Sequence, residues 1–280
     1  MRRLFPVTDQ TPSAAASEGD SAVVSGVDRD WTLDELADVY AYPVGTGGGT
    51  GAGSDADGAA RPWLRANMVS TLDGAAHHEG RSQSISSAAD MRVFGTLRAL
   101  ADAVVVGAET VRQEKYRPAR AREAFAGRRA AAGQRPAPVI AVVSASLELD
   151  FSLPLFTAPL VPTLVLTGAA APAERIRAAE KAGVEVVIAG DGAGADPERV
   201  VRALADRGLV RLLTEGGPRL LGQFVAAGLL DELCLTVSPM LTSGYAQRIA
   251  GGPAPAVPER FALASLLEQD GFLFTRYRHV

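Results

Sequence analysis

The stretch LLTEGGPRLLG, residues 212–222, changes from a strand pattern to a helical pattern within a few residues. A short apolar run is followed by a carboxylate and two glycines, and then by Pro218, a residue favoured at the first position of a helix. A second change of this kind occurs in VVVGAET, residues 104–110, where an apolar run meets Gly107. Glycine lets a ligand approach the backbone, and the N–H groups of a helix N-terminus attract anions. The two turns therefore predict a site for a phosphate-containing ligand, although ordinary strand-to-helix turns use the same residues.

Strands and helices alternate on both sides of these turns. We expect strands at 64–70, 103–106, 139–143, 163–167, 184–188, 210–214, 232–238 and 272–277, and helices at 88–100, 173–182, 198–206 and 218–227. Short apolar strands such as 103–106 are typical of strands covered on both faces. The last two strands have no long helix between them. The pattern predicts an α/β fold with a mostly parallel sheet, helices on both faces and an antiparallel C-terminal edge.

Residues 1–61 are interpreted as an N-terminal extension of a domain that covers residues 62–280. Thr32 is placed to cap a short helix, and Glu35 completes a capping box three residues later. The glycine-rich stretch 45–60 has almost nothing to bury and is expected to be a flexible linker. The apolar face that we expect the short helix to dock on the domain consists of Leu33, Leu36 and Tyr40.

Composition limits the classes of function. The chain has 280 residues, of which 47% are hydrophobic, and this is enough to bury a large core. The formal net charge of -4 argues against a polyanionic partner such as a nucleic acid. No apolar run is long enough to span a bilayer, and no secretory signal follows the first residues, so we expect no membrane role and a cytoplasmic location.

The residues that bind metals or form redox pairs are scarce. Cys234 is the single cysteine and is expected in a buried strand, so an internal disulfide is excluded. His77, His78 and His279 show no metal-ligand spacing, and we expect no metal site. Any redox chemistry therefore requires an organic cofactor. The stretch 115–136, rich in Arg and Ala, is expected to be a long loop of the kind that often binds ligands.

Six ordered segments resemble the reductase domain of the riboflavin-biosynthesis protein RibD. They are NMVSTLDG (67–74), GRSQSIS (80–86), LRALADAVVVGAETVRQE (97–114), VSASLEL (143–149), LLTEGGPRLLGQFVAAGLLDEL (212–233) and SPML (238–241). The resemblance implies a dihydrofolate-reductase-like fold, NADPH as cofactor, and reduction of the ribosyl group of a phosphorylated aminouracil to a ribityl group. It also implies a homodimer, which we expect to form through the strand edge at 231–239.

The resemblance assigns roles to individual positions. Together with the two glycine turns, the residues expected to line the NADPH site are Val69, Ser84, Gly107, Thr110, Glu114, Ser144, Gly216, Gly217, Pro218, Arg219, Leu220, Leu221, Gly222 and Gln223. The residues expected to contact a small-molecule substrate are Ser82, Arg98, Pro118 and Glu215, of which Glu215 is also expected to serve catalysis by holding the substrate. A substrate arginine of the family corresponds to Arg120 or Arg122.

Several of these residues also allow a purely structural interpretation. Arg98 could equally be a solvated cation favoured by the dipole at a helix C-terminus. Glu215 lies between a buried strand and two glycines, where a carboxylate is costly without donors, and this favours a substrate contact. Asp73 is expected to stabilise a turn. Ser144 and Ser146 could donate to a 2′-phosphate or simply cap the end of a strand.

The chain also departs from the family. It has no HxE followed by PCxxC, so the zinc deaminase half of RibD is missing. Asn67 stands where the family usually has a lysine for the substrate phosphate, Ser84 where it often has Trp, and Glu114 where it has Asp. Three hypotheses remain open: the RibD-type reductase, a dihydrofolate-reductase-type enzyme acting on a pteridine, and an NADPH-binding module without catalysis.

Overall fold

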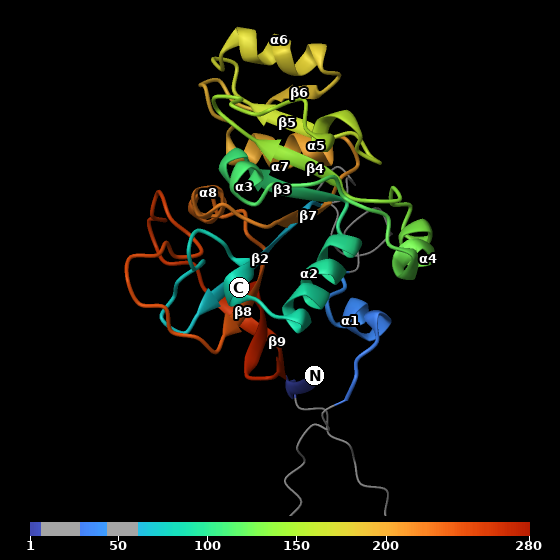
Figure 1. Cartoon of the computed structure of the whole chain (residues 1–280), viewed down its shortest axis with the longest axis vertical. Coiled ribbons are helices and arrows are strands. Elements are labelled where there is room, and N and C mark those ends of the chain that lie inside the picture. Colours follow the sequence, from blue (N-terminus) through green and yellow to red (C-terminus); the bar gives the residue numbers. More distant parts are fainter. Residues whose placement is uncertain (7–28, 44–60) are drawn as a thin grey trace, which may run out of the picture.

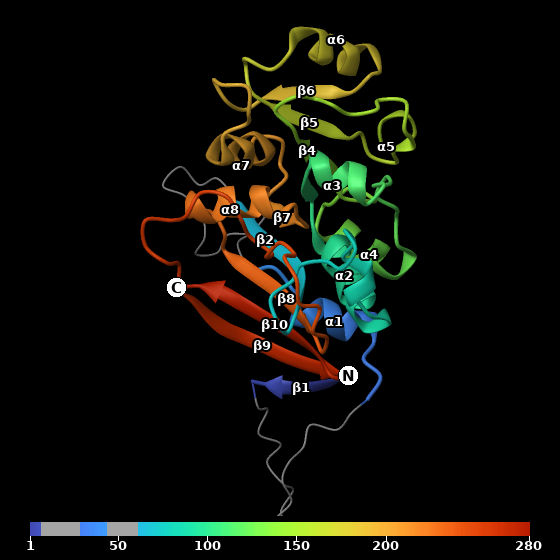
Figure 2. The ribbon, with the colours of Figure 1, turned by 60° about the vertical axis from the view of Figure 1, so that its left-hand side comes forward.

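The computed structural model describes residues 1–6, 29–43 and 61–280, and the strands in these ranges form a single mixed sheet (Figure 1). The parallel strands are β2 (Trp63–Thr71), β3 (Ala103–Gly107), β4 (Val139–Val143), β5 (Leu164–Thr167), β6 (Glu185–Ile188), β7 (Arg211–Thr214) and β8 (Glu232–Ser238). The antiparallel strands at one end are β1 (Arg2–Phe5), β9 (Phe261–Gln269) and β10 (Phe272–His279). The spatial order is β1-β9-β10-β8-β2-β7-β3-β4-β5-β6, with β1 beside β9 at the lower edge in Figure 2.

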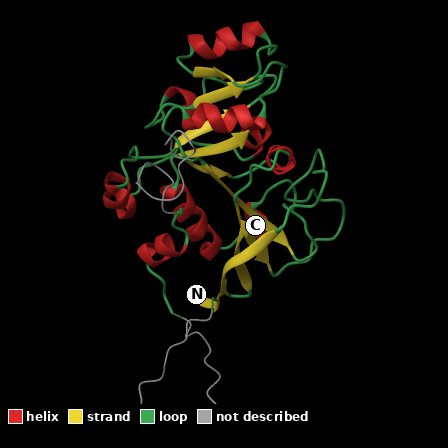
Figure 3. Cartoon of the chain, turned by 180° about the vertical axis from the view of Figure 1, so that it is seen from behind, coloured by secondary structure: helices red, strands yellow, loops and turns green. Residues whose placement is uncertain are grey.

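Helices cover both faces of the parallel part, which Figures 1 and 3 show from opposite sides. One hydrophobic cluster includes residues of α1 (Leu33–Val39), α2 (Ala88–Leu100), α3 (Ala108–Gln113), α4 (Glu123–Ala131), α5 (Pro154–Thr157) and α6 (Ala173–Lys181). The other includes residues of α7 (Pro197–Ala205) and α8 (Pro218–Ala226). In β3, Val104 and Val106 belong to the first cluster, whereas Ala103 and Val105 belong to the second. This alternation confirms a strand that is buried on both faces.

The predicted fold class is confirmed: the sheet is mostly parallel, has helices on both faces and ends in an antiparallel edge. Cys234 is buried in β8, as predicted. The predicted glycine-rich linker at 45–60 lies outside the described residues. Within the described ranges, no helix is long and apolar enough to cross a membrane.

Three features differ from the sequence-based expectation. The stretch 115–136 is not a continuous loop, because α4 occupies its middle. The strands β1 and β9 were not predicted. The strand at 231–239 is not a free edge at which a second subunit could pair. It is β8, which lies inside the sheet with β2 on one side and β10 on the other. Its backbone groups are therefore already paired.

The short N-terminal helix α1 packs on the body of the domain as predicted. The capping box is formed: Glu35 N–H donates to Thr32 Oγ1 at 3.2 Å, and Thr32 N–H donates to Glu35 Oε2 at 2.8 Å. Leu36 and Tyr40 are fully buried in the first cluster. α1 contacts α2, where Arg92 donates to the carbonyl of Trp31. The N-terminal segment therefore braces a helix that carries pocket residues.

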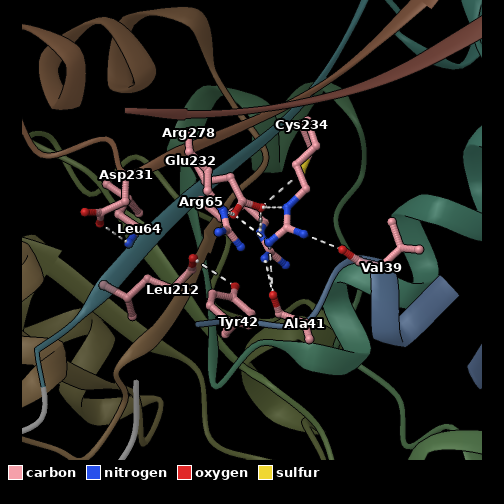
Figure 4. A network of polar contacts seen from close by, with 11 residues as sticks. Val39, Ala41, Tyr42, Leu64, Arg65, Leu212, Asp231, Glu232, Cys234 and Arg278 are labelled. Carbon is pink, nitrogen blue, oxygen red and sulfur yellow. Dashed lines mark hydrogen bonds and ion pairs between the residues drawn. The ribbon is translucent and has the colours of Figure 1, made fainter. Parts of the chain in front are cut away.

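A buried charge cluster contacts the segment after α1 (Figure 4). Glu232 of β8 is fully buried and accepts two hydrogen bonds of 2.9 Å from Arg276 of β10. Arg65 of β2 is also fully buried, with its Nε 2.6 Å from Glu232 Oε1 and its guanidinium over the ring of Tyr42. Burial works against the charge of Glu232, but the two guanidiniums outweigh it and lower the pKa of this carboxyl. The carbonyl of Ala41 accepts from Arg276 at 3.0 Å, so the N-terminal segment completes the cluster.

Candidate active site

A pocket of about 1120 Å³ opens at the carboxyl ends of the central strands. Its walls come from the ends of β2, β3, β4 and β7, from the N-terminus of α8, and from one side of α2. Ligands of open α/β sheets bind at this end of the strands, so the sheet topology alone predicts a ligand site here. The volume suits a large organic ligand or two ligands side by side.

The two glycine turns predicted from the sequence meet at the floor of this pocket. Gly107 N–H donates to the carbonyl of Gly216 at 3.1 Å, because β3 and β7 are neighbours in the sheet. Gly107 and Gly217 are the N-caps of α3 and α8, and no side chain caps either helix. A Cβ atom at Gly217 would lie only 3.0 Å from Thr110 Oγ1. The turns thus expose backbone in a tight space, as a bound diphosphate requires.

Most of the predicted site residues line this one pocket. They are Val69, Ser82, Arg98, Gly107, Thr110, Glu114, Pro118, Ser144, Glu215, Gly216, Gly217, Pro218, Arg219, Leu220 and Gln223. Segments up to 154 positions apart in sequence, from Val69 to Gln223, are therefore brought together by the strand order. Ser82 and Glu114, assigned to substrate and cofactor respectively, contact each other through a 3.2 Å hydrogen bond.

Three predicted residues do not line the pocket, and the reasons are local. The hydroxyl of Ser84 donates to the carbonyls of His78 and Arg81, and it thereby closes a turn. Leu221 is buried in the second hydrophobic cluster beneath α8. Gly222 faces the segment after β8, where a Cβ atom would lie 1.9 Å from the carbonyl oxygen of Gly251. Only some residues in each turn of a helix can face the pocket. The assignment of the whole run 216–223 to the cofactor site therefore included residues on other sides of α8.

Arg98 and Glu215 form a partly buried ion pair in the pocket wall. Arg98 Nε donates to Glu215 Oε1 at 2.7 Å, and Arg98 Nη2 lies 2.5 Å from Glu215 Oε2. The Glu215 side chain is 3% exposed and that of Arg98 is 21% exposed. Arg98 is therefore not the solvated helix-end cation that the sequence allowed. The bidentate pair supplies the donors that a carboxylate at position 215 needs.

Tyr116 completes this group and was missed by sequence reasoning. Its hydroxyl donates to Glu215 Oε2 and accepts from Arg98 Nη2 at 2.5 Å. Burial, and then the neighbouring Glu215 carboxylate, raises the pKa of Tyr116 well above its usual value. Burial alone would lower the pKa of Arg98, but Glu215 and Tyr116 outweigh it and raise that pKa. Arg98 is thus held as a cation and Tyr116 as a neutral phenol.

The loop after α3 lines the pocket with basic side chains. Those that contribute are Lys115, Arg117, Arg120 and Arg122. The Arg122 guanidinium lies directly against Gly95 of α2, where a Cβ atom would be 2.5 Å from Nη1. Met91, Phe94 and Arg98 of α2 also line the pocket. The buried residues of α2 include Val93, Thr96, Leu97 and Leu100.

The far end of the pocket is formed by the loops after β4 and β6. Ser144 Oγ accepts from the backbone N–H of Leu147 at 3.0 Å, so this serine does cap a strand end while it lines the pocket. The loop after β6 crosses the end of β5 so closely that a Cβ atom at Gly168 would lie 1.9 Å from the carbonyl oxygen of Gly192. Gly194 and Ala195 of this crossing line the pocket. The crossing therefore leaves no room for a side chain at Gly168.

Asp73 stabilises the loop at the end of β2, as predicted. It accepts from the hydroxyl of Thr71 and from the backbone N–H groups of Thr242 and Ser243, the latter at 2.6 Å. These hydrogen bonds lower the pKa of Asp73 to about 2. The carboxylate ties the β2 end to the segment after β8, and this segment contributes Tyr245 and Gln247 to the pocket.

A family model described as the RibD C-terminal domain matches residues 62–268. The chain belongs to this family. The match excludes the N-terminal segment that braces α2.

Two reductases resemble the chain over most of their own length. A 2,5-diamino-6-ribosylamino-4(3H)-pyrimidinone 5′-phosphate reductase of Methanothermobacter thermautotrophicus is 32% identical over 184 residues, which is 66% of this chain and 81% of the relative. The reductase of the same name from Archaeoglobus fulgidus is 29% identical, over 66% of this chain and 83% of the relative.

A solved structure of a pyrimidine reductase-like protein from Corynebacterium diphtheriae shows the same fold with a TM-score of 0.71 and 28% identity, covering 78% of this chain and 92% of that one. A reductase family of this kind implies a nicotinamide cofactor. The expected membership of the RibD reductase family is confirmed.

Proposed function

We propose that this chain is an NADPH-dependent oxidoreductase of riboflavin biosynthesis. In this proposal it reduces the ribosyl group of a phosphorylated aminopyrimidine to a ribityl group, which is the class of substrate named for its relatives. The observation that carries the proposal is that two uncapped glycine turns and an ion-paired carboxylate share one pocket of about 1120 Å³. A cytoplasmic homodimer belongs to the same proposal.

The glycine turns are the expected diphosphate site. Backbone N–H groups at the start of α8 carry the positive end of the helix dipole, and the turn at Gly217 leaves no side chain between them and a ligand. At the far end, Ser144, Ser146 and Arg112 line the pocket, and they offer hydroxyls and a cation to a 2′-phosphate. This favours NADPH over NADH. When bound, NADPH supplies the hydride.

The substrate is expected on the α2 side of the pocket. Glu215 accepts hydrogen bonds in all the contacts described above, so it is suited to bind hydroxyl or amino donors of the substrate. Arg122 is the better candidate for the substrate phosphate than Arg120, because its guanidinium is seated on Gly95 of α2. Since Glu215 is an acceptor, the proton that accompanies the hydride is expected to come from solvent.

Dihydrofolate-reductase-type activity on a pteridine is a second candidate. It is favoured by Asn67, which lines the pocket without charge where the family usually has a lysine for the substrate phosphate. Turnover of dihydrofolate but not of the phosphorylated aminopyrimidine would favour this alternative. Binding of NADPH without turnover of either substrate would favour a module that has lost catalysis.

The proposal is tested by calorimetric titration with NADPH and by the loss of NADPH absorbance with each substrate. We expect saturable binding and turnover of the phosphorylated aminopyrimidine. The variant Gly217→Asp places a carboxylate in the diphosphate site, and we expect it to lower NADPH affinity at least about a hundredfold through charge repulsion and blocked access.

Gly127→Asp is the matched control, because Gly127 lies on α4 with no atom near the position of an added Cβ. Circular dichroism checks that both variants fold. Unchanged NADPH affinity in a folded Gly217→Asp protein would refute the diphosphate assignment.

A further inference from the structure

The hydroxyl of Tyr116 lies between the two charged groups of the substrate side. Tyr116 follows α3, and its ring is packed beside the Arg98 guanidinium, 4.9 Å from the ring centroid. The same guanidinium lies 4.4 Å from the centroid of Phe94. Arg98 is therefore confined by two aromatic rings as well as by Glu215, and its position in the pocket wall is fixed.

The direction of each hydrogen bond in this group follows from chemistry. A guanidinium can only donate and a carboxylate can only accept. The Tyr116 hydroxyl therefore accepts from Arg98 Nη2, and its single proton goes to Glu215 Oε2. The raised pKa of Tyr116 keeps this proton in place at physiological pH.

The contacts leave a defined part of Glu215 for a ligand. Oε2 accepts from both Arg98 and Tyr116, whereas Oε1 accepts from Arg98 Nε. A carboxylate has about four acceptor sites, two on each oxygen, so the remaining site is on Oε1. Without the Tyr116 hydroxyl, Oε2 would regain a free site and the carboxylate could turn about its side-chain torsions.

We propose that Tyr116 is a positioning residue that, with Arg98, fixes the Glu215 carboxylate so that only Oε1 accepts a hydroxyl or amino donor of the substrate. This inference rests on the proposed function, which places substrate at Glu215. In this role Tyr116 acts through its hydrogen bond to Glu215. It adds a residue of the loop after α3 to the machinery of substrate recognition.

The first test is Tyr116→Phe, which removes the hydroxyl and keeps the ring beside Arg98. We expect the KM for the phosphorylated aminopyrimidine to rise about tenfold or more, because a hydrogen bond to a charged group is lost. The dissociation constant of NADPH is expected to stay within about twofold. Tyr277→Phe is the control, because Tyr277 lies on β10 outside the pocket, and we expect it to change neither value.

The second test is a double-mutant cycle with Glu215→Gln. If Tyr116 acts through the carboxylate, Tyr116→Phe should raise the KM less than about twofold in the Glu215→Gln background. Additive effects of the two changes would overturn the inference, and so would an equal loss of NADPH affinity in Tyr116→Phe. A single Glu215→Gln variant with unchanged KM would instead contradict the substrate role of Glu215 itself. Thermal unfolding of each variant shows whether a loss of fold explains any change.

Discussion

Asp73 illustrates how a single side chain holds a wall of the pocket. Because its folded-state pKa of about 2 lies below the value of about 3.9 in an unfolded chain, its ionised form stabilises the fold. The contribution is fully present above about pH 4 and is lost as the pH falls towards about 2. We expect the amide hydrogens of Thr242 and Ser243 to lose protection from exchange with solvent as the pH falls through this range. NMR measurements at a series of pH values would show this.

The control for this prediction is Asp73→Asn, which cannot ionise. It should exchange faster at these amides at neutral pH and show no further change between about pH 4 and pH 2. A carboxyl resonance of Asp73 that titrates near the ordinary value would contradict the expected shift.

For single residues, the energetic cost of burying a polar group predicted a role in the site better than the local sequence pattern did. Glu215 was identified because a carboxylate between a buried strand and two glycines needs donors, and the structure supplies Arg98 and Tyr116. Tyr116 was missed because the stretch EKYRPARAR has no periodicity that separates a buried ring from a solvated one. Only the turn after α3 brings it to Glu215. Ser84 was assigned by resemblance alone, and its hydroxyl is already used by the backbone of its own turn.

Among the helices, α2 has one face buried in the core and another that lines the pocket. Gly95 lies on α2 where the Arg122 guanidinium packs against it. An alanine at this position should raise helix stability by about 0.5–1 kcal/mol, because glycine is a poor helix former. Its Cβ would displace the Arg122 guanidinium, the flexible end of a long side chain. We therefore expect Gly95→Ala to keep or raise the melting temperature and to raise the KM for the phosphorylated substrate several-fold.

The matched change is Gly127→Ala on α4, where an added Cβ meets no neighbour within 4 Å. It should give a similar gain in stability without any change in KM. If Gly95→Ala behaves like this control in steady-state kinetics, then Arg122 does not serve the substrate phosphate.

Uniform burial made some strands easy to predict. β3 and β4 are apolar and buried on both faces, so length and composition suffice to identify them. β9 mixes exposed, half-buried and buried positions between β10 and β1, and its irregular pattern gave no period of two. α4 buries only Phe125 and Arg129, so its amphipathic signal is weak. β1 is short and pairs with residues more than 260 positions away, which no local signal can reveal.

Over the whole molecule, the buried charge cluster joins the segment after α1 and the C-terminal strand β10 to the centre of the sheet. Glu232 forms ion pairs with Arg65 and Arg276, and the carbonyls of Val39 and Ala41 accept from Arg276. We propose that residues 31–42 are a structural part of the reductase domain, although the family model begins at residue 62.

Removal of the Glu232 charge should be strongly destabilising. Glu232→Gln leaves two buried guanidiniums without their counter-ion, and breaking such a pair costs about 3–5 kcal/mol. We expect this loss in the free energy of unfolding measured by urea denaturation. Asp191→Asn breaks an exposed pair with Arg199, and we expect it to change the free energy of unfolding far less than Glu232→Gln does. Equal effects of the two changes would show that the buried cluster does not hold the molecule together.

The crossing of the loops after β5 and β6 restricts how the far end of the pocket can be redesigned. Any side chain at Gly168 or Gly190 would collide with backbone, so mutant libraries that randomise these positions would consist mainly of misfolded proteins. Attempts to switch the preference between phosphorylated and unphosphorylated dinucleotides should instead vary Ser146 and Arg112, which are exposed and tolerate replacement.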